Sequence, residues 1–369
     1  MAKSLRKLPK GLVLIKYLGS KRLLIPGIQS VVGGIPNCGR FLDLFSGTSR
    51  VGHAMKQAGW QVILNDWNRY AWVLATAHVV CDPDRQDEIV PLIDHLNALP
   101  GKDGWFTETY CRKSRYFTPE NGARIEAIRE EIENLDPDQE LKCVLLAELM
   151  EAADRIDSTV GVQMAYLKSW SKRSQQPLRL RIPKLLPKSP IGKAEAHCLE
   201  AQEASQKLDA DVAYLDPPYN QHKYIGNYHV WETLVLWDQP EVYGVACKRI
   251  ECREKRSDFN SRVGIHGAMQ KLIHDLSAPI KIISFSDEGY LPRPDMEALL
   301  ENQGKLQVLS RSHARYVGAK IGIHAPSGKK VGKVSHLKNT EYLYILGEVQ
   351  LQEDELLEHG WLVEAPLSA

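Results

Sequence analysis

The sequence is poor in cysteine and has no long apolar run, and each shortage argues against a class of protein. Its seven cysteines among 369 residues include no Cys-x-x-Cys pair, which argues against a disulfide framework and against a tetrahedral zinc site. The apolar stretches are short and interrupted by charge, and the basic residues 1–10 are not followed by an apolar signal segment. We therefore expect a cytoplasmic globular protein without a membrane segment and without a metal site.

The chain also lacks an excess of either charge, but its basic residues are unevenly distributed. The formal net charge is only +1, which by itself does not indicate a nucleic-acid partner. No acidic residue occurs between Asp157 and Glu195 or from Asn302 to Thr340. The basic residues of these two blocks include Lys168, Lys172, Arg173, Arg179, Arg181 and Arg315. Solvated basic loops are common, but two such blocks with interleaved tyrosine and tryptophan favour a phosphate-binding surface.

The order of elements near the N-terminus predicts an α/β protein. Residues 40–45 form an apolar strand that breaks into a short loop, and a helix follows through Ala58 and ends at Gly59. A second strand at residues 60–64 ends at Asn65-Asp66, and a further helix follows it. This order opens a Rossmann-like, doubly wound sheet. Later strands are expected at residues 212–215, 279–285, 305–310 and 341–346.

A helical pattern interrupts the sheet pattern in the middle of the chain. Thr118-Pro119-Glu120 reads as the cap and first turn of one helix, and a second helix is expected from Asp138 to Ile156. Prolines mark irregular connections in the basic block that follows. We expect a mainly helical insertion at residues 82–195 in a sheet domain made of residues 1–81 and 196–369.

The first strand–loop–helix unit predicts a nucleoside site. Ligands of open α/β sheets bind at the carboxyl ends of the strands, where Gly47 permits close approach to the backbone and Asp66 can accept hydrogen bonds from ribose hydroxyls. No lysine follows Gly52 and no G-x-G-x-x-G sequence is present, so a nucleoside without pyrophosphate fits better than ATP or NAD. The alternative is an ordinary strand–turn–helix without a ligand.

The tetrapeptide Asp216-Pro217-Pro218-Tyr219 directly follows the apolar strand at residues 212–215. Two prolines fix φ and remove backbone donors, so the carboxylate and the neighbouring carbonyls are held as acceptors beside an aromatic ring. Such a cluster suits the amino group of a flat base. The alternative is a Pro-Pro loop that only terminates a strand.

Taken together, these motifs resemble the Dam-type, alpha-class DNA adenine-N6 methyltransferases that use S-adenosylmethionine. The resemblance covers most of residues 12–346, in the order of an N-terminal motif at residues 16–21, a Phe-x-Gly-x-Gly-like loop, a strand-end acid, a recognition insertion and Asp-Pro-Pro-Tyr. It implies catalysis by Asp216, Pro217, Pro218 and Tyr219. The cofactor residues that it implies are Tyr17, Lys21, Asp43, Phe45, Ser46, Gly47, Thr48, Ser49, Asp66, Trp67 and Glu200.

Two positions depart from the family pattern or leave it open. Ser49 stands where the family has its second loop glycine, and we expect altered loop detail without loss of binding. The acid that contacts the cofactor's adenine is Glu200 by spacing, with Glu203 as the alternative.

The resemblance implies that Asp216 and the Pro217 carbonyl accept hydrogen bonds from the adenine amino group while Tyr219 stacks on a base flipped out of the duplex. Double-stranded DNA is the expected substrate, with a cognate restriction endonuclease as a possible partner. The expected DNA contacts are Lys168, Lys172, Arg173, Arg179, Arg181, Arg315, Tyr224 and Tyr228, although Tyr224 and Tyr228 could instead belong to a helix packed on the sheet. Methylation of adenine in structured RNA and a binding protein without turnover are the alternatives.

Overall fold

The computed structural model describes residues 15–37, 39–314, 323–324, 330–332 and 338–367. The chain divides into two compact units, which we describe separately. Unit 1 consists of residues 1–20, 76–187 and 224–252, and unit 2 consists of residues 21–75, 188–223 and 253–369. In the described part of the chain, no helix has both the length and the apolar character needed to cross a membrane.

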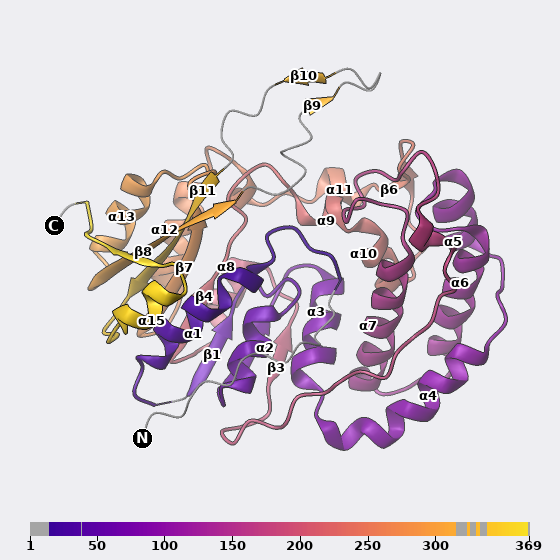
Figure 1. Cartoon of the computed structure of the whole chain (residues 1–369), viewed down its shortest axis with the longest axis horizontal. Helices are drawn as coiled ribbons and strands as arrows, with labels where there is room; N and C mark the ends of the chain where they lie inside the picture. Colours follow the sequence, from indigo (N-terminus) through magenta and orange to yellow (C-terminus); the bar gives the residue numbers. More distant parts are fainter. Residues whose placement is uncertain (1–14, 38, 315–322, 325–329, 333–337, 368–369) are drawn as a thin grey trace. The chain divides into compact units, whose positions relative to one another are not determined.

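Unit 2 is built on an eight-stranded sheet in the order β12-β8-β11-β7-β4-β1-β2-β3 (Figure 1). The strands are β1 (Arg40–Asp43), β2 (Gln61–Asn65), β3 (Glu195–His197), β4 (Val212–Leu215), β7 (Ile280–Ser286), β8 (Leu306–Ala314), β11 (Lys338–Leu346) and β12 (Leu362–Glu364). The five strands from β7 to β3 are mutually parallel, whereas β11 runs antiparallel to both of its neighbours. The predicted doubly wound α/β sheet is confirmed. Two short strands, β9 (Ile323–His324) and β10 (Lys330–Gly332), form a separate ribbon.

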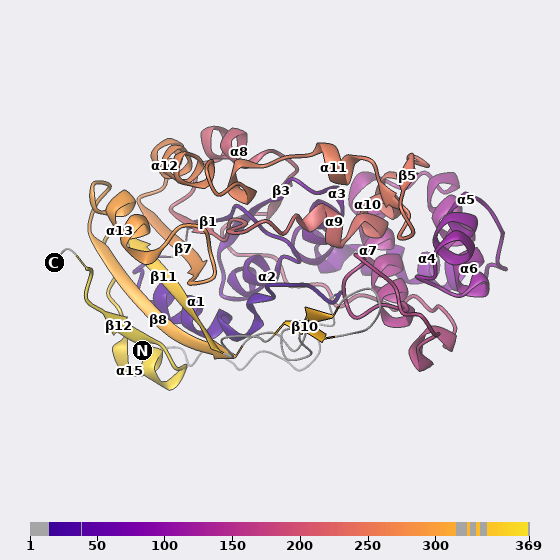
Figure 2. The same ribbon diagram turned by 90° about the horizontal axis from the view of Figure 1, so that it is seen from above.

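Helices cover both faces of this sheet. Figure 2 shows α8 and α12 on one face and α1 and α2 on the other. The helices of unit 2 are η1 (Lys21–Leu23), α1 (Ile25–Gly33), α2 (Arg50–Gln57), α3 (Arg69–Ala75), α8 (Ala201–Lys207), η6 (Asp258–Asn260), α12 (Ile265–Asp275), α13 (Arg293–Glu301) and α15 (Glu353–Glu358). Because two helical layers cover it, every residue of β4 is buried, as expected for a central parallel strand.

The strand register brings the functional loops to one edge of the sheet. Asp43 pairs with Tyr214 near the end of β4, and Asn65 pairs with His197 at the end of β3. The loops that follow β1, β2, β3 and β4 therefore leave the sheet at the same edge, where ligands of parallel α/β sheets bind. β11 runs the other way, so its last residue, Leu346, lies beside Lys281 near the opposite edge.

Unit 1 is mainly helical. Its elements are η2 (Thr76–Val80), η3 (Pro83–Arg85), α4 (Gln86–Ala98), α5 (Trp105–Thr107), η4 (Glu108–Lys113), α6 (Pro119–Asn134), α7 (Gln139–Ile156), η5 (Lys172–Gln175), α9 (Tyr224–Asn227), α10 (His229–Leu236) and a hairpin of β5 (Val242–Tyr243) and β6 (Lys248–Arg249). Helix α11 (Glu251–Glu254) spans a boundary between the units. The side chain of Thr118 caps α6 and that of Asp138 caps α7, which confirms both predicted helix starts.

Most strand boundaries differ by a few residues from the sequence-based expectation, and two differences bear on the site. β1 ends at Asp43, two residues before the expected end, because the chain turns at residues 44–45 and the N–H of Ser46 then donates to the carbonyl of Asn65 at the end of β2. The expected insertion at residues 82–195 makes up most of unit 1, but residues 224–252 pack with it as well. That segment follows Asp-Pro-Pro-Tyr in the sequence, and its helix α10 contacts α7.

Candidate active site

Asp216 forms an ion pair with a lysine from the N-terminal part of unit 2. Its Oδ1 lies 2.9 Å from Nζ of Lys21, and the two side chains are 19% and 10% exposed. Burial raises the pKa of Asp216 above its ordinary value, and the ammonium of Lys21 opposes this rise. The pair holds a charged acceptor at the end of β4.

Lys21 also interacts electrostatically with a second buried carboxylate, that of Glu341 on β11. Burial lowers the pKa of Lys21, but the charges of Asp216 and Glu341 together raise it well above the ordinary value, so the ammonium stays charged. Burial also raises the pKa of Glu341, and its Oε2 has no hydrogen-bond partner among the described residues. The sequence indicated Lys21 as a cofactor residue, but the structure places its ammonium against Asp216.

The aromatic residue of the tetrapeptide is held in place from β7. The ring centroids of Tyr219 and Phe285 are 5.5 Å apart, and the carbonyl of Tyr219 accepts the Tyr290 N–H at 2.8 Å. Burial raises the pKa of Tyr219 to about 12, so its hydroxyl stays neutral at physiological pH. The ring is therefore partly buried against the hydrophobic cluster at this end of the sheet.

The loop after β1 is tied to the end of β2 through Asp66. Gly47 N–H donates to Asp66 Oδ2 at 3.0 Å, and the backbone and side chain of Asn68 both donate to Oδ1 at 2.9 Å. Burial raises the pKa of Asp66, although these hydrogen bonds oppose the rise. An ionised carboxylate accepts about four hydrogen bonds, so Asp66 retains acceptor capacity for a ribose hydroxyl.

Asp43, the last residue of β1, is hydrogen-bonded to the helix that follows the same loop. Its Oδ2 accepts the Gly52 N–H of helix α2 at 3.0 Å, and the side chain is fully buried. Burial, together with a smaller effect of the neighbouring Asp216 and Asp66 charges, raises the pKa of Asp43 to about 7, although the hydrogen bond from Gly52 opposes the rise. Asp43 thus orients the loop and α2.

Two loop hydroxyls are buried without a partner in the part that the structure describes. Ser46 and Ser49 are 7% and 0% exposed, and within the described structure their Oγ atoms form no hydrogen bond. A buried hydroxyl without a partner costs about 1–3 kcal/mol. Because both hydroxyls are buried, the fit to S-adenosylmethionine rests on Gly47, which permits close approach to the backbone, and on the remaining acceptor capacity of Asp66 for the ribose.

Ser49 adopts a conformation that favours glycine. Its φ of 57° and ψ of 25° lie in the left-handed region, at the position where the family has its second loop glycine. Such a conformation costs a non-glycine residue about 1 kcal/mol or more. Ser49 therefore occupies a backbone position that glycine adopts at lower cost.

We expect Ser49→Gly to raise the free energy of unfolding of the ligand-free protein by about 1 kcal/mol, because it removes left-handed strain and an unsatisfied hydroxyl. Denaturant unfolding measures this change. Ser46→Gly is the matched control: it removes the other unpartnered hydroxyl, but at a position without positive φ the added chain freedom of glycine costs about 0.4–1 kcal/mol, so its gain should be smaller than that of Ser49→Gly. A loss of stability in Ser49→Gly would contradict the assignment.

The remaining predicted cofactor residues of unit 2 lie at the same sheet edge. Phe45 and Thr48 belong to the loop after β1. The rings of Phe45 and Phe259 pack edge to face, with their centroids 5.5 Å apart. Trp67 follows Asp66 in the sequence. Nζ of Lys255 lies over the Trp67 ring, 4.0 Å from the ring centroid.

Glu200 and Glu203 differ in their surroundings. Glu200 follows β3 and caps α8, since its Oε2 accepts the Gln202 N–H at 2.8 Å. Glu203 is exposed and pairs with Lys207 at 2.6 Å, one turn further along the helix. Of the two, Glu200 is the acid at the strand-end edge.

Three predicted aromatic residues form a stack in unit 1. The Tyr17 ring lies between those of Tyr224 and Tyr228, with centroid distances of 5.2 Å and 4.8 Å. Tyr228 is 1% exposed, and its hydroxyl accepts the Leu18 N–H at 2.7 Å. In this arrangement Tyr228 holds the N-terminal segment and has no surface for DNA, whereas Tyr224 is half-buried.

The predicted basic residues also divide by their contacts. Lys168, Lys172, Arg179 and Arg181 are exposed on unit 1. Arg173 instead forms an ion pair with the buried Asp157 and donates to the carbonyls of Asp157 and Thr159, so it serves the fold of unit 1. Arg315 lies outside the described residues.

Sequence patterns missed two residues that connect the loops. The side chain of Asn65 donates to the carbonyls of Leu44 and Leu199 at 3.2 Å and accepts the Leu199 N–H at 3.0 Å, so it joins the loops after β1 and β3. Its only sequence signal was its place at a strand end. Lys255 donates to the Trp67 carbonyl at 3.0 Å from 188 residues away, and no local pattern indicated this contact.

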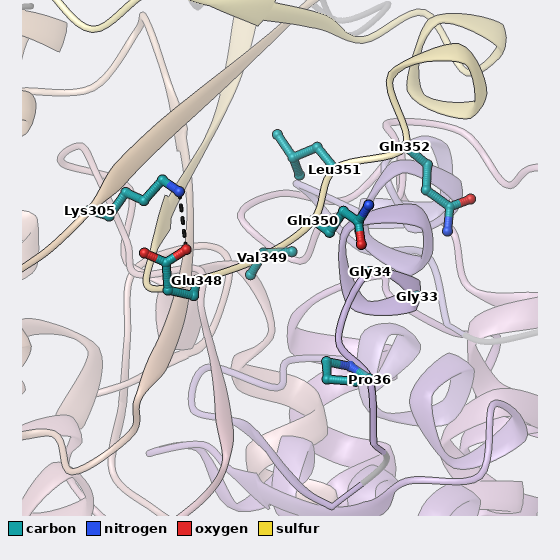
Figure 3. Close-up of a pocket in the computed structure, with 9 residues that line it drawn as sticks. All are labelled: Gly33, Gly34, Pro36, Lys305, Glu348, Val349, Gln350, Leu351 and Gln352. Atoms are coloured by element: carbon teal, nitrogen blue, oxygen red, sulfur yellow. Dashed lines mark hydrogen bonds and ion pairs between the residues drawn. The ribbon is translucent and has the colours of Figure 1, made fainter.

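A hollow of about 860 Å³ in unit 2 lies elsewhere, between the end of α1 and the segment after β11 (Figure 3). Its charged lining residues are Lys305 and Glu348, which pair with each other at 3.0 Å. Because β11 ends near the start of β7, this hollow is at the edge opposite the catalytic loops. Within the described part of the chain, no three His, Cys, Asp or Glu side chains gather as metal ligands.

Comparison with known proteins identifies the family of this chain. The family model of the D12 class N6 adenine-specific DNA methyltransferases matches residues 17–287. The chain is 28% identical to the type II methyltransferase M.NlaIII of Neisseria lactamica, over 90% of this chain and 99% of that protein. It is 31% identical to M.CviAII of Paramecium bursaria Chlorella virus 1, over 82% and 92% of the two chains. It is 30% identical to M.FokI of Planomicrobium okeanokoites, but there it spans only 47% of the longer protein. The chain belongs to the D12 class of N6 adenine-specific DNA methyltransferases.

Proposed function

We propose that Asp216 and Lys21 form the catalytic core of this DNA methyltransferase, with the loop after β1 as the cofactor site. The main support is the ion pair between Lys21 Nζ and Asp216 Oδ1, which are 2.9 Å apart. This pair supplies a charged acceptor at the edge of the sheet where the parallel strands end. The exocyclic amine of adenine is a weak nucleophile, since its lone pair is delocalised into the ring. Hydrogen bonds from N6 to Asp216 and the Pro217 carbonyl localise that pair.

The cofactor residues are assigned by their contacts. We assign the ribose hydroxyls to Asp66, the amino acid portion to the backbone of the loop from Ser46 to Ser49, and the adenine to Glu200 at the strand-end edge. Trp67, Phe45, Gly47 and Thr48 shape the walls, while Asp43 orients the loop. S-adenosylmethionine supplies a sulfonium methyl group as the electrophile. N6 attacks in line, so the C–N bond forms as the C–S bond breaks, and N6 then releases one proton to solvent.

The target adenine must leave the duplex to reach Asp216. Stacking on Tyr219 supplies about 1–3 kcal/mol toward the few kcal/mol that unstacking costs. Pro217 and Pro218 keep the tetrapeptide rigid, so these contacts need little ordering when the base arrives. We assign recognition of the duplex to unit 1, whose exposed Lys168, Lys172, Arg179 and Arg181 suit phosphate contacts.

The relatives are named as type II methyltransferases and modification methylases. We propose a cytoplasmic enzyme of restriction-modification type, which acts alongside a restriction endonuclease that cleaves the same unmethylated sequence.

The test measures transfer of labelled methyl from S-adenosylmethionine to unmethylated genomic DNA and, in parallel, to total RNA, followed by digestion to nucleosides. We expect N6-methyladenine in DNA alone, at one sequence once the modified sites are mapped by sequencing. Label only in RNA would overturn the proposal, and so would methylated adenines without a shared sequence. Digestion of the same DNA by nucleases from the host then tests the endonuclease partner, which should cut unmethylated DNA only.

A further inference from the structure

The strand register of unit 2 places a second carboxylate on the same face of the sheet as Asp216. β7 lies between β4 and β11, with Leu215 beside Ile283 and Ser286 beside Glu341 (Figure 1). Paired residues share a face, and successive side chains of a strand point to opposite faces. Leu215 and Ile283 belong to the hydrophobic cluster on one face. Asp216, which directly follows Leu215, therefore shares the other face with Ser286 and Glu341.

Glu341 is buried beside polar groups of the active site. The residue is 8% exposed, and its Oε2 forms no hydrogen bond with the residues that the structure describes. Beyond the effect of burial, which is the largest for each group, the charge of Glu341 raises the pKa of Lys21 and of Tyr219. Burial also dominates the raised pKa of Glu341, which Lys21 opposes and Asp216 increases. Electrostatic effects fall with distance, so the carboxylate lies close to the tetrapeptide and its lysine.

Several charged groups of unit 2 lie around Glu341, and Lys21 attracts it. Arg311 lies opposite Glu341 on β8, but its guanidinium donates to a backbone carbonyl of η1. Asp287 and Glu288 follow β7, and their charges add to the rise in the pKa of Glu341 that burial produces. The side chains of both residues accept hydrogen bonds from β11. Lys21 is therefore shared between Glu341 and the carboxylate of the tetrapeptide.

One ammonium between two ionised carboxylates leaves one negative charge in excess. Positive charge grows on N6 as the methyl group arrives, because the amine donates its lone pair to carbon. An ammonium paired with Asp216 alone would cancel much of the negative potential that stabilises this cation. The carboxylate of Glu341 offsets the ammonium, so the potential of Asp216 at N6 is preserved.

We propose that Glu341 is a positioning residue of methyl transfer, which holds Lys21 between two carboxylates and preserves the negative potential of Asp216 at N6. The role rests on the function proposed above, and it requires no contact of Glu341 with the base or the cofactor. The excess negative charge also favours the sulfonium cation of S-adenosylmethionine over S-adenosylhomocysteine, the neutral thioether that remains after transfer. Glu341 thereby supports binding of the reactive form of the cofactor.

Glu341→Gln removes the charge of the side chain but keeps its size. In mildly alkaline buffer, which favours ionisation of the wild-type carboxyl, single-turnover methyl transfer to DNA should fall about 10-fold, because the Lys21 ammonium then opposes the cation that forms on N6. Affinity for S-adenosylmethionine should fall about fivefold, whereas affinity for S-adenosylhomocysteine should be unchanged. Glu348→Gln is the matched control, because Glu348 is exposed, pairs with Lys305 at 3.0 Å and should change none of these values.

The double variant Lys21→Met/Glu341→Gln tests whether Glu341 acts through Lys21. Without the ammonium, the Glu341 carboxylate only repels Asp216 and favours the protonated form of that carboxyl. The double variant should therefore transfer methyl at least as fast as Lys21→Met alone. A residue that contacted the substrate directly would instead add its own loss to that of Lys21→Met.

Oε2 of Glu341 has no hydrogen bond to lose within the described residues, so we expect Glu341→Gln to keep the fold, and circular dichroism verifies it. The role of Glu341 is overturned if Glu341→Gln transfers methyl at the wild-type rate, if both forms of the cofactor lose affinity equally, or if the double variant is slower than Lys21→Met. If the wild-type protein methylates DNA in the same assay, each of these results removes the role of Glu341 alone and leaves the proposed function intact.

Discussion

Replacing Asp216 with asparagine should reduce methyl transfer to DNA at least about 1,000-fold while leaving cofactor affinity within a few fold. Asparagine keeps the size of the side chain but loses the charge, and it leaves the Lys21 ammonium without the carboxylate that lies 2.9 Å away. Loss of one preorganised polar group at a reacting centre costs about 100- to 1,000-fold, and the unpaired lysine adds to that cost.

Single-turnover transfer of labelled methyl measures the chemical step, and calorimetry measures cofactor binding. Asp209→Asn is the control, because Asp209 lies seven residues before Asp216 and is exposed. This variant should transfer methyl at the wild-type rate. Near-normal transfer in Asp216→Asn would mean that the Pro217 carbonyl alone localises the N6 lone pair.

Lys21→Met should reduce methyl transfer about 100-fold at neutral pH, and the loss should shrink as the pH rises. Burial raises the pKa of Asp216 and Lys21 opposes that rise, so removal of the ammonium raises the pKa further. At a given pH a larger fraction of Asp216 then holds a proton, and the protonated carboxyl accepts hydrogen bonds poorly. The acid limb of the pH–rate profile therefore moves to higher pH, which a purely structural role for Lys21 would not produce.

Stability gives an independent readout of the same variant. The pKa of Asp216 is higher in the folded than in the unfolded variant, so its protonated form stabilises the fold at low pH. That stabilisation is lost as the pH rises from the ordinary carboxyl range through the raised pKa. We expect the free energy of unfolding of Lys21→Met to fall over this range relative to wild type, in urea titrations at several pH values. Lys207→Met is the control, since its exposed pair with Glu203 contributes at most about 1 kcal/mol. If the acid limb of the pH–rate profile of Lys21→Met stays at its wild-type pH, the coupling of Lys21 to Asp216 is refuted.

The sequence predicted the parts of the site whose signals are local. Asp216 to Tyr219 is a contiguous motif, and the loop at residues 45–49 with Asp66 follows the spacing of a strand–loop–helix–strand unit. The caps at Thr118 and Asp138 are likewise local, because a cap bonds amides two or three residues away. Long-range contacts escaped prediction, as with Lys255 on Trp67 and Asn65 between two loops. Their residue types are common, and nothing in the neighbouring sequence specifies a partner.

The sequence alone determined the fold class, the order of the motifs and the chemistry of the acceptor cluster, because hydrophobic periodicity, turn residues and contiguous motifs are properties of short segments. Only the tertiary structure decided that Lys21 faces Asp216 and that residues 224–252 pack with the helical unit. It also separated Arg173, which neutralises a buried aspartate, from the exposed lysines beside it in the basic block. These outcomes depend on which distant segments pack together, and burial then determines which charges pair within the protein and which remain at the surface.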